Sequence, residues 1–313
     1  MSVISPSASI GASNLRQKIW DGVIPVEITL APDDCSDLNS VDVLYLNVHR
    51  LSYFPIYFSK FALYFKPFLR DFGAVSSSEW WLEFEGVPLK WNWPIGLLYD
   101  LLTGLNPNPW DEDTSSGFGQ GSEKDNDDQN KEELNWHLPW SLILHYSHYP
   151  TDVLLRLTDL QDVKDHWVNR LKEVDYLRRG NSNTVMNLSK ADSDAIWYGV
   201  EQHDFDKFWS INSKILPSDP MSLRNVPIKV YLPSCNKVLQ ALVPPLAARN
   251  EVHTLGTALN LHLPELFPSR RTCIFSRPVL HGVNLSLAVP LVELLYECMY
   301  TDGYLHICIA MIR

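Results

Sequence analysis

Cysteine and histidine side chains are the first candidates for catalytic chemistry in this sequence. A thiol nucleophile needs a histidine within hydrogen-bond reach, and Cys308 lies close to His306. The two positions are separated by one residue in a predicted strand, so both side chains lie on the same face, and we expect that face to be in the core. The pattern therefore favours a structural pair over a catalytic one.

Metal and nucleotide sites are equally poorly supported. His145 and His148 are expected on opposite faces of one strand, with His137 upstream, so a shared ligand sphere is not predicted. The glycine-rich segment 117–122 (GFGQGS) matches neither the dinucleotide-binding nor the P-loop pattern. The sequence predicts no catalytic residue, no metal and no cofactor. No pair of cysteines has the CxxC spacing typical of zinc sites among Cys35, Cys235, Cys273, Cys298 and Cys308.

Charge is concentrated in one segment of the 313 residues. The net charge is −11, and residues 111–133 contain nine acidic residues against two lysines, which leaves about −4 for the rest. No basic stripe is present, so a nucleic-acid partner is not expected. Because residues 106–135 have few large apolar side chains, we predict a disordered acidic insertion.

The first residues carry no basic start followed by an apolar run, and no stretch approaches the ~18 apolar residues that span a bilayer. We therefore expect a soluble, intracellular protein. The tryptophans Trp80, Trp81, Trp91 and Trp93 allow two interpretations, a sugar-binding platform or a core with an interface patch. Alternation along the chain divides them between two faces and favours the second.

A weak internal repeat indicates the architecture. The strand patterns VIPVEITL (23–30) and NVPIKVYL (225–232) open two stretches of about ninety residues with the same order of elements. Each stretch then has a strand, a helix, two strands, a short leucine-rich helix and a closing strand. The order resembles the ubiquitin-like β-grasp. Gly86, Leu89, Pro94 and Leu98 of the first copy match Gly282, Leu285, Pro290 and Leu294 of the second.

Between the two copies the sequence predicts helices. Residues 160–179 carry an apolar stripe at helical spacing, which ends at Gly180. Ser189 and Asp192 form a predicted N-terminal capping pair, and a second long helix is expected to run from there to about Leu216. The stripe consists of Leu160, Val163, Trp167, Leu171 and Val174.

These elements predict an α+β fold with two ubiquitin-like β-grasp domains flanking a helical domain, and a short N-terminal helix. The predicted parts are a flexible N-terminus with the short helix (1–24), the first ubiquitin-like domain with the acidic insertion (25–150), the helix-rich domain (151–220) and the second ubiquitin-like domain (221–313).

The chain resembles the autophagy protein 5 family over nearly its whole length. The acidic segment and the long N-terminal extension depart from the family pattern without touching the shared motifs. Those motifs are the W-x-G-x-I-P pattern of Trp20 to Pro25, FEGVPLKWNWPIGLLYDLL (84–102), WVNRLKEVDYL (167–177), DFDKFWSINSKI (204–215) and DGYLHICI (302–309).

The resemblance implies a non-catalytic scaffold. In that family one lysine of the helical domain, which corresponds to Lys172, forms an isopeptide bond with the C-terminal glycine of autophagy protein 12. The product binds a helix of autophagy protein 16 in a groove. The complex then acts like an E3 ligase on autophagy protein 8, together with the E2 enzymes of the pathway. The implied localisation is the cytoplasm and the preautophagosomal structure, as a peripheral membrane protein.

Helical geometry adds an expectation for Lys172. The centre of the apolar stripe lies roughly 150° from this lysine around the helix axis. We therefore expect Lys172 to project to solvent with Asp165, Asn169 and Tyr176.

A short helix over residues 13–20 is also predicted, with Ser13 as its cap and Gly22 as its stop. Leu15, Ile19 and Trp20 are the partner-binding candidates on this helix, although it could instead pack only on its own chain. The alternative function is a non-covalent ubiquitin-like adaptor. The chain ends Met311-Ile312-Arg313 rather than in an exposed glycine, so we expect it to receive a modifier and not to be one.

Overall fold

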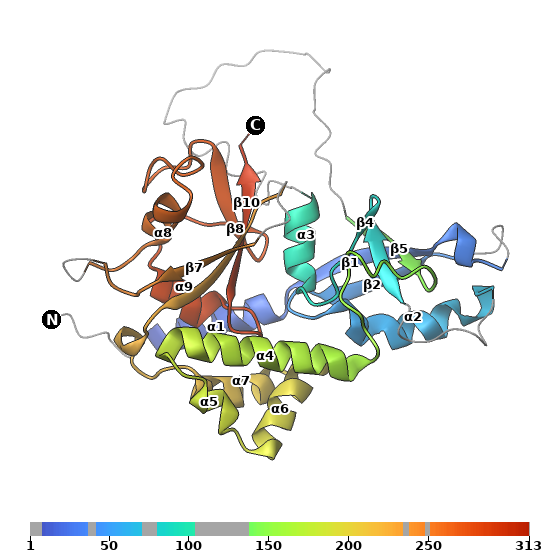
Figure 1. The fold of residues 1–313 in the computed structure, drawn as a ribbon, viewed down its shortest axis with the longest axis horizontal. Coiled ribbons are helices and arrows are strands. Elements are labelled where there is room, and N and C mark those ends of the chain that lie inside the picture. Colours follow the sequence, from blue (N-terminus) through green and yellow to red (C-terminus); the bar gives the residue numbers. More distant parts are fainter. Residues whose placement is uncertain are drawn as a thin grey trace, which may run out of the picture.

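Three structural units make up the described part of the chain. The computed structural model describes residues 8–36, 42–70, 80–103, 138–233, 238–247 and 251–312. Two sheet units lie on either side of the molecule, and a group of helices lies below and between them (Figure 1). The predicted acidic insertion lies outside the described residues.

The first unit is a five-stranded mixed sheet curled around a helix. Its strands follow the order β2-β1-β5-β3-β4, with β1 and β5 parallel and the other neighbours antiparallel. Every second residue of β1 is buried, as the alternating sequence predicts. The elements are β1 (Val23–Leu30), β2 (Leu44–His49), α2 (Phe58–Phe65), β3 (Trp81–Phe84), β4 (Val87–Pro88), α3 (Ile95–Thr103) and β5 (Trp140–His145).

The second unit repeats this topology. Its strand order is β7-β6-β10-β8-β9, again with a parallel central pair, β6 and β10. The predicted duplication of a β-grasp unit is confirmed. The elements are β6 (Val226–Tyr231), β7 (Leu239–Val243), α8 (Leu255–His262), β8 (Ser276–Leu280), β9 (Val283–Asn284), α9 (Leu291–Cys298) and β10 (Leu305–Met311).

The repeated glycines mark two equivalent hairpin turns. Between β3 and β4 the turn residues Glu85 and Gly86 have φ angles of 48° and 80°, and between β8 and β9 His281 and Gly282 have 53° and 76°. A two-residue turn with positive φ at both positions matches the twist of the paired strands, and glycine adopts it most easily. The matching glycines that reveal the repeat in the sequence, Gly86 and Gly282, are therefore favoured by the backbone conformation of these turns.

The helical unit follows the prediction in its first helix and departs from it afterwards. Helix α4 spans Leu160–Arg179 as predicted, but the second long helix is two helices, α6 and α7. His203, with a φ of 55°, reverses the chain between them, and Asp204 caps the new helix by accepting from the backbone N–H of Lys207. The helices of this unit are α4 (Leu160–Arg179), α5 (Asn183–Met186), α6 (Lys190–Glu201) and α7 (Phe205–Ile215).

Three further local predictions are corrected. The aromatic segment 53–69, expected to form the one helix of the first repeat, is α-helical only over α2, because Pro55 and Pro67 lie in short 3-10 turns on either side. Helix α1 spans Ala8–Trp20 and so begins before Ser13. His148 is not on the strand of His145, because β5 ends at His145.

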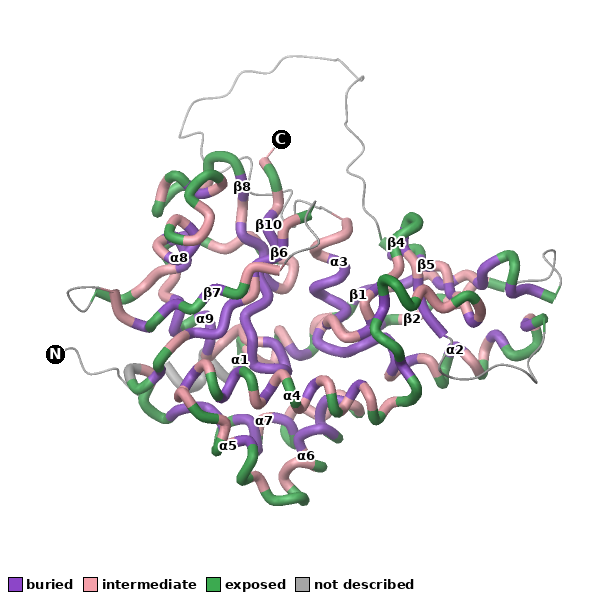
Figure 2. Tube along the Cα trace, in the orientation of Figure 1, coloured by how far each residue is buried: buried purple, intermediate pink, exposed green. Residues whose placement is uncertain are grey.

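The hydrophobic core is divided unequally among the units. The first ubiquitin-like unit has its own buried cluster, whereas the helical unit and the second unit share one. The buried segments of this shared core run through the centre of the molecule in Figure 2. Trp91 and Leu97 extend from the first unit into the shared core, and Trp93 meets Tyr231 edge-on at 4.9 Å. The tryptophans thus form core and an internal interface, as predicted.

One buried carboxylate links the two ubiquitin-like units. Helix α3 packs against β10 and β8. Its Asp100 pairs with Arg50 and also accepts a hydrogen bond from the backbone N–H of Gly282 at 2.8 Å. One carboxylate thus satisfies donors from both units, which orients them relative to each other.

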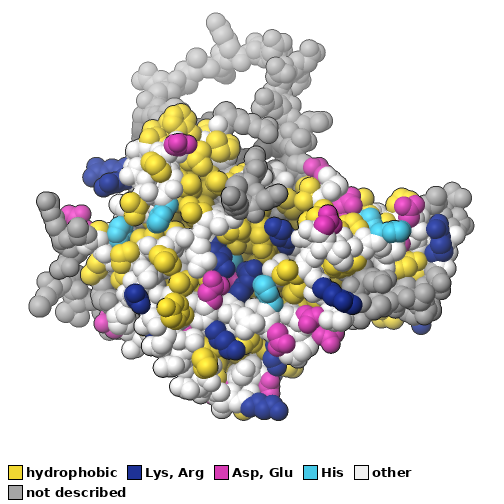
Figure 3. Space-filling model, in the orientation of Figure 1, with side chains coloured by type: hydrophobic (Ala, Val, Ile, Leu, Met, Phe, Trp, Pro, Cys, Tyr) yellow, Lys and Arg dark blue, Asp and Glu magenta, His cyan; other side chains and the backbone are white. Residues whose placement is uncertain are grey.

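Some apolar side chains remain on the surface of the second unit. Figure 3 shows hydrophobic side chains over this unit, and Leu261 and Phe275 are among its exposed residues. Folded proteins always leave part of their apolar surface in water, so this observation alone assigns no function. Among the described helices, none is both long enough and apolar enough to cross a bilayer.

Acidification from pH 7 to pH 5 is expected to lower the free energy of unfolding. Burial lowers the pKa of His166 and His203 to about 4 and that of His281 to about 3. Unfolded histidine titrates at about 6.5, so below that pH the unfolded state binds protons that the folded state does not. Each such histidine removes at most about 1.4 kcal/mol per pH unit, less where solvent screens it.

Urea unfolding at pH 7, 6 and 5 measures this effect. The variant His203→Gln, which removes one of the titrating rings, is expected to show a shallower dependence on pH. A free energy of unfolding that is constant over this range would contradict the prediction.

Candidate functional site

Helix α4 carries Lys172 and is well defined at both ends. The side chain of Asp159 caps it by accepting from the backbone N–H groups of Gln161 and Asp162. Gly180, with a φ of 80°, ends it in the left-handed conformation that favours glycine. Lys172 lies near the middle of this helix, away from ends that could fray.

The predicted faces of α4 are present, with one difference. Val163, Trp167, Leu171 and Val174 are buried, whereas Asp165, Asn169 and Tyr176 are exposed. Lys172 is half-buried rather than fully exposed. The reason is the neighbouring helices α5 and α6, which the helical period of α4 alone does not reveal.

A hollow of about 410 Å³ opens between α4, α5 and α6. Its buried lining includes Leu171 of α4, Val185 of α5 and Ile196 of α6. Lys172 and the exposed Lys190 also line it. Lys172 thus lies at an open concavity lined by both apolar and polar side chains.

The lysines of the helical unit differ in their partners. Lys164 pairs with Asp194 at 2.9 Å, and Lys214 pairs with Asp192 at 3.5 Å. Within the described ranges Lys172 makes no hydrogen bond or ion pair. Its amino group is therefore not held by an internal carboxylate.

The opposite side of α4 is attached to the second ubiquitin-like unit. The buried guanidinium of Arg178 donates to the backbone carbonyl of Gly303 at 2.6 Å. Gly303 has a φ of 84°, and a Cβ there would lie 2.9 Å from Val174 Cγ1. Position 303 therefore needs glycine both for its conformation and for the close approach of α4.

A second buried contact between α4 and the second ubiquitin-like unit involves Arg170 of α4. Arg170 Nη1 lies 3.3 Å from the Asp302 carboxylate, which also accepts from His306 Nε2 at 2.9 Å. Burial opposes the charge on Asp302, but the His306 ring and Arg170 stabilise it, so its pKa lies below the ordinary value. Burial also lowers the pKa of His306, so the ring is neutral and its Nδ1 accepts from the Tyr231 hydroxyl at 2.8 Å.

These contacts give structural roles to the residues first considered for catalysis. Cys308 is buried, and its Sγ lies 3.8 Å from the Leu97 carbonyl. Burial raises the pKa of this thiol well above its ordinary value, which disfavours the reactive thiolate. His137 lies outside the described residues. Across the described ranges, no group of three or more His, Cys, Asp or Glu residues is arranged to hold a metal ion.

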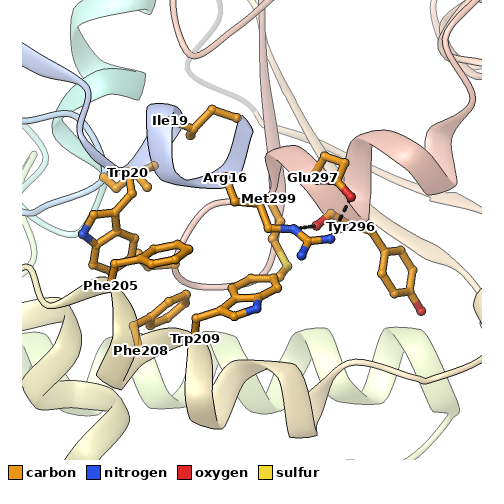
Figure 4. Close-up of a pocket in the computed structure, with 11 residues that line it drawn as sticks. Arg16, Ile19, Trp20, Phe205, Phe208, Trp209, Tyr296, Glu297 and Met299 are labelled. Atoms are coloured by element: carbon orange, nitrogen blue, oxygen red, sulfur yellow. Dashed lines mark hydrogen bonds and ion pairs between the residues drawn. The ribbon is translucent and has the colours of Figure 1, made fainter. Parts of the chain in front are cut away.

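The second candidate surface is a small pocket beside helix α1. It lies between α1, α7 and the end of α9, and Figure 4 shows the side chains that line it. Arg16 of α1 pairs with Glu297 at 2.7 Å, and its guanidinium lies over the ring of Trp209, 4.5 Å from the ring centre. Leu15 is exposed and Ile19 is half-buried. The helix thus packs on its own chain while Leu15 stays accessible.

Trp20 is placed differently from Leu15 and Ile19. It is buried, and its ring stacks on His203 with centroids 4.7 Å apart. The indole N–H donates to the His203 carbonyl at 3.2 Å, and His203 Nε2 donates to the Trp20 carbonyl at 2.8 Å. His49 of the first unit stacks on the other face of His203, with ring centroids 3.4 Å apart. Most of the Trp20 side chain therefore serves to join α1, β2 and the α6–α7 turn.

Comparisons with known proteins identify the family. Residues 19–146, 160–218 and 225–309 match the UblA domain, the alpha-helical bundle region and the UblB domain of autophagy protein ATG5. The chain is 39% identical to autophagy protein 5 of Phaeosphaeria nodorum over 313 aligned residues, covering 96% of this chain and 97% of that protein. The chain belongs to the autophagy protein 5 family.

Two further similarities agree with this assignment. Autophagy protein 5 of Aspergillus fumigatus is 35% identical, with 96% of each chain covered. The crystal structure of Kluyveromyces marxianus Atg5 has a TM-score of 0.73 at 20% identity, covering 95% of this chain and 99% of that one, which supports the fold. The predicted resemblance and the predicted α+β fold with two ubiquitin-like domains are confirmed.

The pocket of this family member includes residues that the sequence alone did not single out. Phe205 and Trp209 of α7 line it, with stacked rings 6.2 Å apart. They are spaced one helical turn apart, which was an available signal. Arg16 had no comparable signal, because its partners Tyr296 and Glu297 are 280 and 281 residues away in the chain.

Replacement of Trp20 by alanine is expected to destabilise the protein by about 3–5 kcal/mol, because a large buried aromatic side chain is lost. Thermal or urea unfolding measures the change. The matched control is Leu15→Ala on the same helix, which is expected to change stability by less than about 0.5 kcal/mol because Leu15 is exposed. Equal effects of the two substitutions would contradict the assigned core role of Trp20.

Proposed function

We propose that this protein is the acceptor of a ubiquitin-like modifier in autophagy, conjugated through Lys172 to autophagy protein 12. Family membership supports the role in autophagy. The observation that carries the residue assignment is the environment of Lys172, a lysine without an internal partner in the middle of a capped helix, at the edge of a hollow. An acceptor amine has to enter the active site of a carrier enzyme, and this position meets that requirement.

The proposed reaction is the aminolysis of a thioester. The neutral amine of Lys172 attacks the carbonyl carbon that joins the glycine of the modifier to the cysteine of the E2 carrier. A C–N bond forms, the C–S bond breaks, and the thiolate leaves with the carrier. The proton of the amine passes to a base of the carrier or to water.

The acceptor itself contributes position rather than acid–base chemistry. The adjacent Glu173 lies 3.5 Å from Lys229 and accepts from Gln240, and Asp194 at the hollow pairs with Lys164. These carboxylates already interact with other donors. We therefore assign no general base to this chain, and the protein acts as a scaffold.

The pocket beside α1 supports the second part of the proposal, a groove for a helix of autophagy protein 16. An amphipathic helix binds through apolar residues on one face and needs an apolar groove with a polar rim. Ile19 and Trp209 line the pocket, and the Arg16–Glu297 pair provides a rim. Leu15 lies one turn before Ile19 on α1 and adds exposed apolar surface beside the pocket. Trp20 contributes mainly by holding α1 in place.

The complete proposal is an E3-like complex. The conjugate with autophagy protein 12, bound to autophagy protein 16, would promote transfer of autophagy protein 8 from its E2 to phosphatidylethanolamine. Such a complex works at the preautophagosomal structure as a peripheral membrane assembly recruited from the cytoplasm. The competing proposal is a ubiquitin-like adaptor that binds the same partners without a covalent bond.

The substitution Lys172→Arg is expected to abolish the conjugate, because it keeps the charge and the helix but removes the nucleophilic amine. A denaturing gel of the protein from its native source measures the shifted band, and mass mapping of the linked peptide identifies the lysine. Folding and autophagy protein 16 binding are expected to be unchanged, while lipidation of autophagy protein 8 is lost.

The matched controls are Lys164→Arg and Lys190→Arg, which lie on the same helical unit and are expected to retain the conjugate. An isopeptide bond mapped to either lysine would overturn the assignment of Lys172. A wild-type protein that shows no shifted band while the partners still bind would favour the adaptor.

Substitution of both Leu15 and Ile19 by aspartate is expected to weaken the binding of an autophagy protein 16 helix by about tenfold or more, because the loss of central apolar contacts dominates such interfaces. Titration calorimetry with the helix measures the affinity. Leu63→Asp, at an exposed leucine of α2, serves as the control. Conjugation at Lys172 is expected to continue in both variants, and an unchanged affinity would reject this groove.

A further inference from the structure

The hollow beside Lys172 has apolar side chains in its lining, and the folded chain itself does not fill it. Its volume is about 410 Å³, and its apolar lining comes from all three surrounding helices, including Val168 of α4, Val185 and Met186 of α5 and Ile196 of α6. Met186 is 64% exposed, so this thioether already faces solvent at the edge of the hollow. A concavity of this kind suits an apolar side chain from outside.

The position of Lys172 limits what can enter the hollow during conjugation. The glycine carbonyl carbon has to bond directly to Lys172 Nζ, and an extended chain spans at most ~3.6 Å per residue. The residue before the glycine is therefore within about two residue lengths, roughly 7 Å, of the amine. Lys172 itself lines the hollow, so the side chain of that residue can reach it.

We propose that this hollow binds the side chain immediately preceding the C-terminal glycine of the modifier, and that it selects for a large apolar side chain there. The inference rests on the acceptor role of Lys172 proposed above. The ligand is an extended peptide tail that ends in an apolar residue and glycine. Binding of the apolar side chain holds the thioester carbonyl next to Lys172 and leaves the bonds made and broken as described above.

The chemistry of the lining supports an apolar residue over a positively charged one. Asp194 pairs with Lys164, and the less buried apolar side chains of the lining are Val168, Met186 and Leu188. A cationic side chain placed there would face Lys172 and Lys190, and it would lose water without gaining a partner, which is unfavourable. A glycine or alanine at the same position would leave the hollow open and would lose the favourable burial.

The same geometry explains the choice between two lysines at one hollow. Lys172 lies in the middle of α4, whereas Lys190 is the first residue of α6 and is exposed. If the apolar side chain of the modifier's tail binds between α4, α5 and α6, the position of the following glycine is restricted. The hollow therefore acts as a specificity-determining feature that positions the donor for Lys172.

The substitution Ser193→Trp tests this inference by filling the hollow without adding charge. Ser193 is half-buried in the lining, and the matched control is Ser210→Trp on the exposed side of α7. Conjugation is reconstituted with full-length protein, the modifier and its carrier enzymes, and initial rates are read from the shifted band. Ser193→Trp is expected to lower the rate at least about tenfold, the effect of losing one large buried apolar side chain, whereas Ser210→Trp keeps the wild-type rate.

Two further measurements make the result specific. Met186→Glu, at an exposed edge position that folding tolerates, is expected to lower the rate in the same direction. Replacing the residue before the terminal glycine of the modifier by alanine is expected to slow the wild-type acceptor but to add little to Ser193→Trp, because both changes remove one contact. Thermal unfolding of each variant checks that the helical unit is intact.

The outcomes separate this inference from the acceptor assignment. Conjugation that fails in Lys172→Arg but proceeds at the wild-type rate in folded Ser193→Trp and Met186→Glu overturns the hollow and leaves the acceptor intact. Conjugation that persists in Lys172→Arg overturns the acceptor assignment. If the rate reductions caused by the alanine replacement in the modifier tail and by Ser193→Trp multiply when the two are combined, the proposed contact is also overturned.

Discussion

The buried carboxylate of Asp302 constrains the position of helix α4, on which the candidate site depends. It has no exposure to water and is stabilised by Arg170 of α4 and by His306 of β10. Removing one partner of a buried charge typically destabilises a protein by about 3–5 kcal/mol, so a rotation of α4 that breaks this contact is strongly disfavoured. Lys172 follows Arg170 by two residues and therefore projects about 200° further round the helix. A contact with the second ubiquitin-like unit thus directs Lys172 to the other side of α4.

Much of the architecture could be predicted from local patterns. Alternation defines β1 within its observed bounds, and the apolar stripe together with Gly180 defines α4. The repeat was detectable because both hairpins need positive φ angles at the same place, which keeps Gly86 and Gly282 in register with the leucine-rich helices that follow. These features depend on neighbours within a few residues, and such information is present in one sequence.

What could not be predicted depends on contacts between distant segments. The turn at His203 interrupts a helical pattern because Gly199 lies against the backbone of Phe208, where a Cβ would be only 2.6 Å from a backbone nitrogen. Trp20 was a partner-binding candidate on a short helix, yet it is buried and its hydrogen-bond partner is 183 residues away. The half-burial of Lys172 has the same origin, because α5 and α6 form the hollow. The helical period of α4 carries no information about these neighbours, so it predicted an exposed lysine where the structure has a half-buried one.

The surroundings of Lys172 bear on why one lysine would be modified among several. Lysine side chains lose up to about 2 kcal/mol of conformational freedom when they are immobilised, so a stem that already lies against a hollow has less to lose on reaction. An amine held by a carboxylate, as Lys164 is by Asp194, would first have to break that ion pair. Lys172 has less of both costs, because its side chain is half-buried and its amine forms no ion pair with the described residues. Under the proposed function, selection of this residue would follow from its position and its restrained stem, which a scaffold can supply to the active site of another enzyme.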